Sequence, residues 1–229
     1  MKAVYASTVN HADPLAALAV GEQPEPQARP FWSTVSVRAV TVNHHAVWSL
    51  QGVGLAAEQT PMILGTDAVG ILDEDIPGKH GLKAGSEVVL YTFVGTDGAG
   101  VAPGERRTIL SEKYPGTMAE KTSVPSANVF AKPASLTTAE AAALGTSWLT
   151  AYSLLFDAAG IKPGDSVLIQ GAGGGVSTAA IQLAHAAGLE VFVTSRDADK
   201  RSKALKLGAN AALEIGARLP RKVDAVIES

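Results

Sequence analysis

The sequence predicts a β-rich domain of the barrel type, followed by an α/β domain built on a parallel sheet. Three observations lead to this prediction. The first half contains short apolar segments separated by Gly and Pro, which is typical of small barrels. After residue 136 the apolar residues recur with helical spacing. A buried strand, a glycine-rich turn, a helix and a second strand then follow over residues 166–194, which is the order of a parallel βαβ unit.

The composition limits the classes of function that the chain can have. The 229 residues are 46% apolar and 18% charged, which is enough for one or two domains with apolar cores. The formal net charge of −3 argues against nucleic acids and anionic membranes as partners, because both attract basic surfaces. The absence of cysteine excludes disulfides and thiolate ligands. The first residues lack the apolar run of a signal peptide, and the uncharged stretch 167–189 is too polar for a membrane span. We therefore expect a cytoplasmic protein.

Segments of the first half predict strands and loops. Residues 32–42 alternate apolar and polar side chains as far as Ala39 and then shift phase by one, which predicts a strand with a β-bulge. The proline-rich segment 21–30 and the glycine-rich segment 95–108 predict surface loops. Further strands are expected at residues 1–7, 70–72, 87–92 and 122–125.

The second half predicts alternating helices and strands. Thr137 and Glu140 have the spacing of a capping box, which opens a helix that runs to about residue 159. Later strands are expected at 166–170, 190–194, 211–215 and 223–228, and later helices at 176–188 and 200–207. We place the domains at residues 1–130 and 131–229. Because a doubly wound sheet usually has about six strands, we expect the α/β domain to be incomplete in this chain.

The glycine-rich turn predicts a dinucleotide site. In GAGGGVS (171–177) the best register is Ala172-x-Gly174-x-x-Ser177, with serine at the position of the usual third glycine. A tight turn into a helix leaves N–H groups that bind a pyrophosphate, and glycines let the phosphates approach the backbone. A purely structural turn is the alternative. The expected cofactor-binding residues of this turn are Ala172, Gly173, Gly174, Gly175 and Val176.

The residues after the second strand predict which dinucleotide binds. About twenty residues past the central glycine, an Asp or Glu would accept hydrogen bonds from a ribose 2′-OH; this chain has Ser195 there. Arg196 follows at once, and Lys200 and Arg201 lie one helical turn further on. Cationic side chains suit a 2′-phosphate, so NADP(H) is predicted over NAD(H). The alternative is that these residues form a solvated helix face, since Asp197 and Asp199 dilute the positive charge.

Five stretches resemble one known family. They are TVNHHAVWSLQG (41–52), ILGTDAVG (63–70), GTMAEKTSVPSANVFAKP (116–133), AAALGTSWLTAY (141–152) and VLIQGAGGGVSTAAIQLA (167–184). Together they resemble the medium-chain dehydrogenase/reductases, and most closely the zinc-independent, quinone oxidoreductase-like branch. The resemblance implies an N-terminal GroES-like β-barrel domain, a C-terminal Rossmann domain, an active site in the cleft between them, and a homodimer in the full-length form.

The resemblance also indicates that no metal is bound. Zinc-dependent members hold a catalytic zinc at positions that correspond here to Asn43, Thr66 and roughly Thr146, and none of these is a good zinc ligand. His44 and His45 are adjacent, so along an extended strand they would point to opposite faces and would not share one ion. We expect them to be polar cleft or loop residues.

Four residues gain roles from the resemblance alone. Asn43 matches an Asn kept beside the nicotinamide, Trp48 an aromatic position that lines the substrate pocket, and Thr150 a Thr near the cofactor. Thr66 joins Asn43 and Trp48 as an expected catalytic residue. Ala46 departs from the family, which commonly has Asp there. The ordinary alternatives are that Trp48 is a core residue and that Thr150 bonds its own helix backbone.

The expected activity is hydride transfer from NADPH to a quinone or to the β-carbon of an enone or enal. Without zinc there is no Lewis acid for simple alcohol oxidation, so an already activated small-molecule acceptor fits better. The enolate oxygen would be stabilised by donors such as the Asn43 amide or a ribose hydroxyl of the cofactor. Two alternatives stay open: an NADP(H)-binding protein with little or no turnover, and a zinc-type alcohol dehydrogenase.

Overall fold

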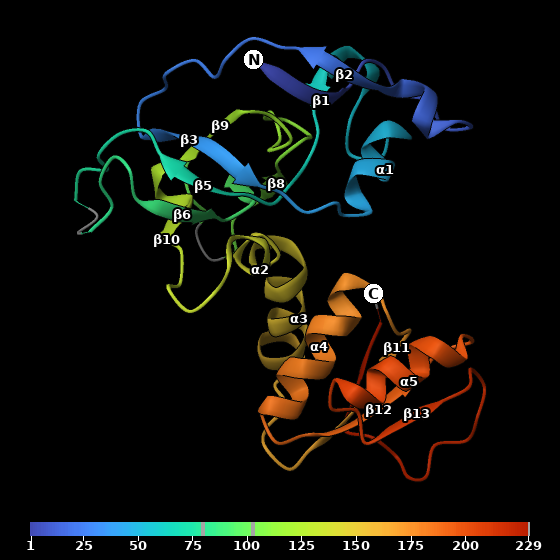
Figure 1. Cartoon of the computed structure of the whole chain (residues 1–229). Helices are drawn as coiled ribbons and strands as arrows, with labels where there is room; N and C mark the ends of the chain where they lie inside the picture. The colour runs from blue at the N-terminus through green and yellow to red at the C-terminus, as the bar shows by residue number, and fades with distance from the viewer. Residues whose placement is uncertain (79–80, 102–103, 229) are drawn as a thin grey trace. The chain divides into compact units, whose positions relative to one another are not determined.

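A computed structural model describes residues 1–78, 81–101 and 104–228, and the chain divides into two compact units, Met1–Thr146 and Ser147–Ser229. Each unit is described by itself (Figure 1). The division falls later than the boundary expected at residue 130. The reason is that helix α2 (Thr138–Ala142) packs on the first unit, where Ala141 and Ala142 are buried against Val69.

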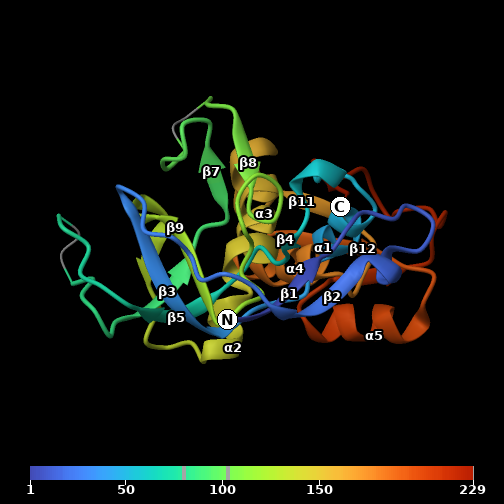
Figure 2. The same ribbon diagram turned by 90° about the horizontal axis from the view of Figure 1, so that it is seen from above.

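The first unit is built from antiparallel strands. A five-stranded sheet has the order β10-β6-β5-β3-β9 (Figure 1). A three-stranded sheet has the order β2-β1-β4. Strands β7 and β8 pair as a hairpin (Figure 2). The strands are β1 (Lys2–Ala6), β2 (Leu18–Glu22), β3 (Trp32–Ala39), β4 (Met62–Ile63), β5 (Val69–Leu72), β6 (Glu87–Leu90), β7 (Phe93–Gly95), β8 (Arg107–Ile109), β9 (Lys121–Pro125) and β10 (Val129–Ala131). The short helix α1 (His45–Leu50) follows β3.

The predicted bulge in β3 is confirmed. Val37 pairs with Gly70 and Ala39 pairs with Val69, so Arg38 is the extra residue of the bulged strand. The strand ends at Ala39 rather than at residue 42. The side chains on the two sides of the bulge enter different apolar clusters, since Val37 packs in the cluster that contains Val35, Val88 and Leu110, whereas Ala39 packs in the cluster that contains Val69, Ala141 and Ala142.

Five strands of the described part of the first unit were not foreseen. Strand β2 overlaps the expected loop at 21–30, and β7 and β8 stand where segment 95–108 begins and ends. Strands β4 and β10 were also missed. Strand β2 lies at a sheet edge with half-buried or exposed residues only, so it carries no apolar alternation that would identify it. These strands form because a neighbouring backbone is available for pairing.

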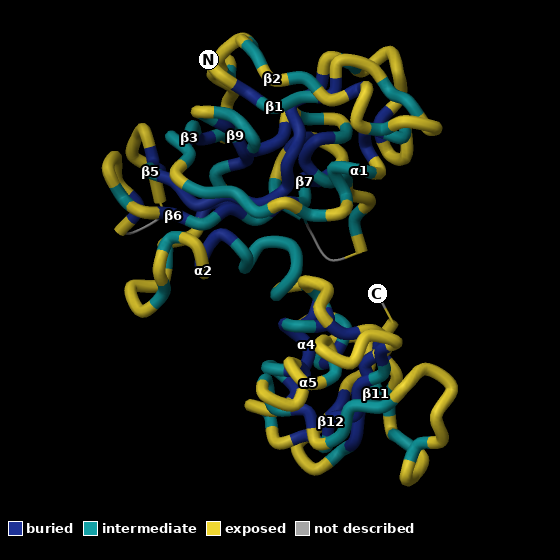
Figure 3. The backbone as a smooth tube through the Cα atoms, turned by 45° about the vertical axis from the view of Figure 1, so that its right-hand side comes forward, coloured by how far each residue is buried: buried dark blue, intermediate teal, exposed yellow. Residues whose placement is uncertain are grey.

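The second unit is a parallel sheet with helices packed on it. The strand order is β13-β12-β11-β14, and every neighbouring pair is parallel. Its elements are α3 (Leu149–Tyr152), β11 (Ser166–Gln170), α4 (Gly175–Ala186), β12 (Glu190–Thr194), α5 (Ala198–Lys206), β13 (Ala211–Leu213) and β14 (Ala225–Ile227). Figure 3 shows β11 and β12 as the buried centre of this unit. The partial Rossmann fold predicted for this half is confirmed.

The helix expected from 137 to 159 is broken into pieces. Its start is as predicted, because Glu140 N donates to Thr137 Oγ1 at 3.3 Å and Thr137 N donates to Glu140 Oε2 at 2.9 Å. Helix α2 ends at Ala142, and π-helical turns then occupy Leu144–Trp148 and Ser153–Ala158 on either side of α3. In the described part of the chain, we find no helix with the length and apolar character needed to cross a bilayer.

Candidate cofactor and reaction sites

The glycine-rich turn joins β11 to α4 without any side-chain cap on the helix. Gly171 and Gly173 have φ of 83° and 86°, the left-handed region that favours glycine. Gly174 is the extended N-cap residue and makes no side-chain cap hydrogen bond. The first N–H groups of a helix point out of its N-terminus, here toward the glycine-rich turn, and this arrangement favours a bound phosphate.

Close packing at this helix start is provided by Gly175. A Cβ built on Gly175 would come within 2.5 Å of Ser147 Oγ, so the helix approaches Ser147 more closely than any other residue type allows. Ser177, which stands in place of the usual third glycine, is buried beside Gly174 without a clash. Ala172 is itself part of the apolar core, and Val176 packs against that core.

The sheet topology also indicates a ligand site at the glycine-rich turn. Strand β11 lies between β12 on one side and β14 on the other, so the strand order reverses beside β11. In open parallel sheets, ligands bind at the carboxyl ends of the strands where the order reverses. The glycine-rich turn leaves β11 at that end. Thr150 lies half-buried in α3, which packs against α4 in the same unit.

The residues after β12 form a cationic edge next to the turn. A Cβ built on Gly173 would lie 3.1 Å from Lys200 Cδ, so the lysine stem crosses the turn. A pocket of about 430 Å³ is lined here by Gly173, Thr178, Ile181, Lys200, Lys203, Ala204, Lys206 and Leu207. Ser195 is buried and Arg196 is exposed. Asp197 caps α5 by accepting Lys200 N at 3.0 Å, and this hydrogen bond lowers the pKa of Asp197 below its ordinary value.

Arg201 belongs to the structure of this edge. Its Nη1 donates to the carbonyl oxygen of Ser195 at 2.7 Å and to that of Arg196 at 3.1 Å, and Nη2 contacts Glu214 Oε1 at 3.1 Å. Arg201, which was expected among the cations for a 2′-phosphate, therefore braces the loop that carries Ser195 and Arg196. The cations that line the pocket at Gly173 are Lys200, Lys203 and Lys206.

A polar cluster lies inside the first unit, and we name it the Asp67 cluster. It consists of Thr41, Asn43, Thr66, Asp67 and Thr146. Asn43 Nδ2 lies 2.8 Å from Asp67 Oδ2, 3.0 Å from Thr66 Oγ1 and 3.1 Å from Thr41 Oγ1. Thr146 Oγ1 donates to Asp67 Oδ1 at 2.6 Å, and Thr41 Oγ1 donates to Asp67 Oδ2. Asn43 and Thr66, both expected catalytic residues, are thus in contact.

Asp67 is the member of this cluster whose pKa is shifted. It is fully buried, and burial raises the pKa of its carboxyl group above the ordinary value, although the hydrogen bonds from Thr146, Thr41 and Asn43 act in the opposite direction. Sequence reasoning missed both Asp67 and Thr41. The signal for Asp67 was a lone carboxyl group inside the apolar run PMILGTDAVGIL (61–72).

The contacts of the Asn43 amide lie within the cluster. An Asn side chain has two N–H hydrogens, and three oxygen atoms inside the cluster lie within hydrogen-bond distance of Nδ2. The role expected for Asn43 beside the nicotinamide stays a prediction.

Trp48 and the two histidines lie outside the Asp67 cluster. His44 and His45 stand at the start of α1 rather than on an extended strand. The His44 ring packs edge-on against Trp48 at 5.2 Å, and Trp48 is 48% exposed, so it is a surface residue of α1 and not a core residue. His45 Nε2 lies 3.3 Å from Glu112 Oε1.

The donor atoms do not suit zinc. Asn43, Thr66 and Thr146 do come together, as the resemblance implied, but they offer an amide nitrogen and hydroxyl groups. Within residues 1–78, 81–101 and 104–228, no three His, Asp or Glu side chains are grouped as metal ligands would be.

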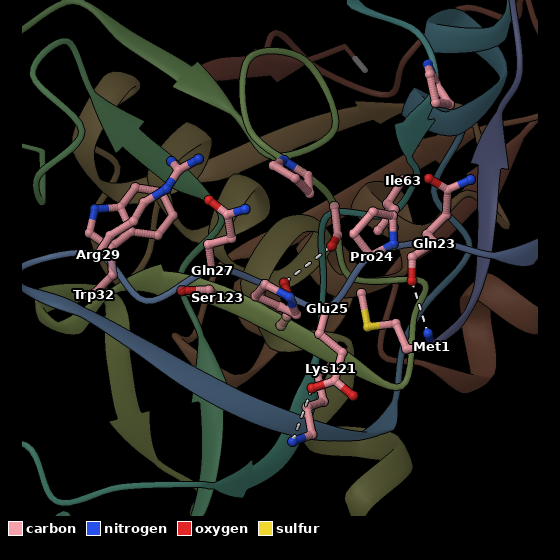
Figure 4. A pocket seen from close by; sticks show the side chains of 15 residues that line it. Met1, Gln23, Pro24, Glu25, Gln27, Arg29, Trp32, Ile63, Lys121 and Ser123 are labelled. Atoms are coloured by element: carbon pink, nitrogen blue, oxygen red, sulfur yellow. Dashed lines mark hydrogen bonds and ion pairs between the residues drawn. The ribbon is translucent and has the colours of Figure 1, made fainter.

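A separate pocket of about 360 Å³ opens elsewhere in the first unit. Figure 4 shows its wall of proline-rich chain at residues 23–29, with Trp32 and Arg29 at one end and an ion pair between Lys121 and Glu25. Segment 21–30, expected as a loop, forms this wall. None of the expected site residues lines the pocket.

Comparisons with known proteins agree with this architecture. Residues 29–134 match the model of the alcohol dehydrogenase GroES-like domain. A crotonyl-CoA reductase of Streptomyces avermitilis is 30% identical over 227 residues, covering 88% of this chain and 51% of the relative. A solved NAD-dependent alcohol dehydrogenase has a TM-score of 0.83 at 34% identity, covering 95% of this chain and 64% of the other. A quinone oxidoreductase of Pseudomonas syringae pv. Tomato DC3000 has a TM-score of 0.77 at 25% identity, covering 95% and 59%.

The fold combines a GroES-like domain with a partial Rossmann domain, which is the architecture of the medium-chain dehydrogenase/reductases. The chain belongs to the medium-chain dehydrogenase/reductase superfamily. It spans about half the length of the crotonyl-CoA reductase that it matches.

Proposed function

We propose that this chain is an NADPH-dependent reductase that transfers hydride to a quinone or to an activated enone or enal, without zinc. The observation that carries the proposal is the cationic edge beside the glycine-rich turn. Lys200 crosses Gly173, Arg196 is exposed in the loop after β12, and Ser195 occupies the position where an NAD-binding site has a carboxylate. The names of a crotonyl-CoA reductase and a quinone oxidoreductase among the similar proteins support an activated acceptor.

The residues of the turn fit such a cofactor. The uncapped start of α4 and the left-handed Gly173 leave a backbone cradle that a side chain would fill. The N–H groups of this turn would hold the pyrophosphate, and Arg196 with Lys200 would hold a 2′-phosphate. When bound, NADPH supplies the hydride. The chain itself binds the cofactor, orients it and excludes water.

The first unit would supply the acceptor site. Asn43 and Thr66 lie together in the Asp67 cluster, and Trp48 offers an exposed aromatic surface on α1. Amide and hydroxyl groups are poor zinc ligands, so no Lewis acid is available to stabilise an alkoxide. The substrate must therefore already be activated for hydride addition, as a quinone or a conjugated carbonyl compound is.

Calorimetric titration with NADPH and, separately, NADH tests the proposal. We expect NADPH to bind at least tenfold tighter. The Lys200→Met variant should lose most of that preference, whereas Lys222→Met, an exposed lysine away from the turn, should keep it. Equal or tighter binding of NADH would contradict the NADPH preference. NADPH oxidation is then followed spectroscopically with a panel of quinones, enones and enals.

The second candidate is an NADP(H)-binding protein with little turnover. It is favoured by the orientation of Asn43, whose amide hydrogens serve the Asp67 cluster. Tight NADPH binding, together with no oxidation by any acceptor of the panel, would support this candidate over the reductase.

A further inference from the structure

Asp67 is a buried acid without a countercharge. None of the ion pairs among the described residues includes it, and the groups that contact its carboxyl oxygens are Thr41, Asn43 and Thr146. No charged side chain faces it from residues 41–43, from the Thr117 turn or from residues 145–146. Burying a carboxylate with neutral partners only is costly, so such a group calls for a functional explanation.

The contacts on the two carboxyl oxygens differ. Oδ2 accepts from Thr41 and Asn43, which keep that oxygen inside the cluster. Oδ1 accepts from Thr146, whose hydroxyl group stands 2.6 Å away on a half-buried residue. A Cβ at Gly145 would meet Asp67 Oδ1 at 2.7 Å, so the glycine allows this close approach. Thr146 is therefore the half-buried member of the cluster that contacts Oδ1, whereas Asp67 itself is buried.

The direction of the Thr146 hydroxyl group depends on the charge of Asp67. When Asp67 is ionised, Thr146 donates its hydrogen to Oδ1. When Asp67 is protonated, the acid donates to Thr146 Oγ1, and the Thr146 hydrogen must turn away. Thr66 Oγ1 lies 3.0 Å from Thr146 Oγ1, and it accepts from Asn43 Nδ2, so it can donate to Thr146 in both states and hold the side chain in place.

We propose that Asp67 and Thr146 form a proton relay that supplies the proton needed after hydride addition to the substrate. The relay rests on the proposed reductase function. Hydride addition to the β-carbon leaves an enolate, which needs one proton on the α-carbon. Thr146 Oγ1–H gives its proton to that carbon, whose electron pair forms the new C–H bond while the carbonyl group re-forms. The proton of Asp67 moves to Thr146 Oγ1, and the resulting carboxylate regains a proton from water.

The relay assigns separate roles to the members of the cluster. Thr146 would touch the substrate and is a catalytic residue. Asp67 acts through Thr146, and Asn43 and Thr66 are positioning residues. Burial keeps Asp67 protonated at a higher pH than an exposed aspartate, which suits a proton donor. His45 is not part of this relay, since its Nε2 lies 3.3 Å from Glu112 Oε1.

The first test is the pH dependence of kcat for NADPH oxidation with an enone. The wild type should lose rate as the pH rises through the pKa of Asp67. Asp67→Asn and Thr146→Val should lower kcat about 100-fold, since positioned proton transfer contributes at least that factor. The loss of rate at high pH (the pH limb) should be absent from both variants. Thr146→Ser should restore most of the rate. Variants that keep the wild-type rate and limb would overturn the relay.

Thr117→Val is the matched control. Thr117 is also buried, and its hydroxyl group donates to the backbone oxygen of Asp67 at 2.8 Å, so its removal disturbs the same place without breaking the relay. It should keep the pH limb and lie within about threefold of the wild-type kcat. A 100-fold loss in this variant would mean that the cluster has only a structural role, which would overturn the relay.

A second readout separates failure of the relay from failure of the proposed function. The chain is labelled with ¹³C at the aspartate carboxyl carbons, and Asp67 is assigned by comparison with Asp67→Asn. We expect Asp67 to titrate above the ordinary range, and Thr146→Val to raise its pKa further because a hydrogen bond that lowers it is lost. Titration in the ordinary range, or no response to Thr146→Val, would overturn the relay even if the chain reduces enones. A wild type that oxidises no NADPH would instead overturn the reductase function.

Discussion

The side chain of Lys200 lies across Gly173. A Cβ on Gly173 would lie 3.1 to 3.3 Å from three consecutive carbons of the lysine stem. The turn and the helix α5 are thus fitted to each other, and the lysine is held at the edge of the uncapped start of α4. The two residues form one element of the cofactor site that we propose.

Two glycines of the turn should respond differently to alanine. Gly173→Ala places a side chain in the left-handed region and against Lys200, so we expect a loss of about 1 to 2 kcal/mol in the free energy of unfolding. Gly174→Ala meets only Ser177 Oγ at 3.7 Å and has ordinary dihedral angles, so stability should change little. NADPH affinity should fall in both variants. Urea denaturation and calorimetry measure the two effects, and a fully stable Gly173→Ala would contradict the argument.

Substitutions of two arginines at the cationic edge should have different effects on stability and on cofactor binding. Arg196→Gln should leave the free energy of unfolding within about 0.5 kcal/mol of the wild type while weakening NADPH binding about tenfold and sparing NADH. Arg201→Gln removes the hydrogen bonds to the carbonyl oxygens of Ser195 and Arg196, so it should cost about 1 kcal/mol of stability. The prediction fails if Arg196→Gln weakens NADPH and NADH binding equally.

Asp67 should make stability fall as the pH rises. Its pKa is raised by folding, so the native state binds more protons than the unfolded state between the ordinary value of 3.8 and the raised value. The favourable contribution is therefore complete below pH 3.8 and is lost as the pH rises through the raised pKa. Comparison of urea denaturation of the wild type and Asp67→Asn across this range isolates the effect. An identical pH dependence in both proteins would contradict it.

Asp224 should have the opposite pH dependence. Ser166 N and Oγ donate to Asp224 Oδ2 at 2.8 and 2.7 Å, which ties the start of β14 to β11 and lowers the pKa of Asp224. Its contribution is present above the ordinary pKa and lost as the pH falls through the lowered one. Asp224→Ala should increase hydrogen exchange in β14 at neutral pH and have a smaller effect in acid. Equal exchange in the variant and the wild type at neutral pH would show that the tie contributes nothing.

The sequence predicted the second unit better than the first. Helices and strands there follow from periodicity, and β11 and β12 occupy the expected residues. In the first unit, the strands that were missed are β2, β4, β7, β8 and β10. Each has only two to five residues, which is too short for an alternating pattern to identify a strand. The bulge at Arg38 was visible because it changes the phase of an alternating strand.

The two candidate sites also differ in how far the sequence predicts them. The turn at 171–177 and the cations after β12 are local in sequence, so their residues could be named. The Asp67 cluster joins residues 41–43, 66–67 and 146, and only the folded chain shows that a buried acid connects them. The structural role of Arg201 was hidden for the same reason, because its partners include Glu214. The homodimer and the cytoplasmic location stay predictions.

The extra residue in β3 sets the phase of the chain beyond it. After Arg38 the pleat is shifted, so Ala39 faces the apolar residues of α2 and the chain then delivers Thr41 and Asn43 to Asp67. The side chain of Arg38 is exposed, and its chemistry plays no part in this. What brings Thr41 and Asn43 to Asp67 is the presence of one extra residue in β3. The type of that residue does not matter. Related chains should therefore vary freely in composition here but not in length.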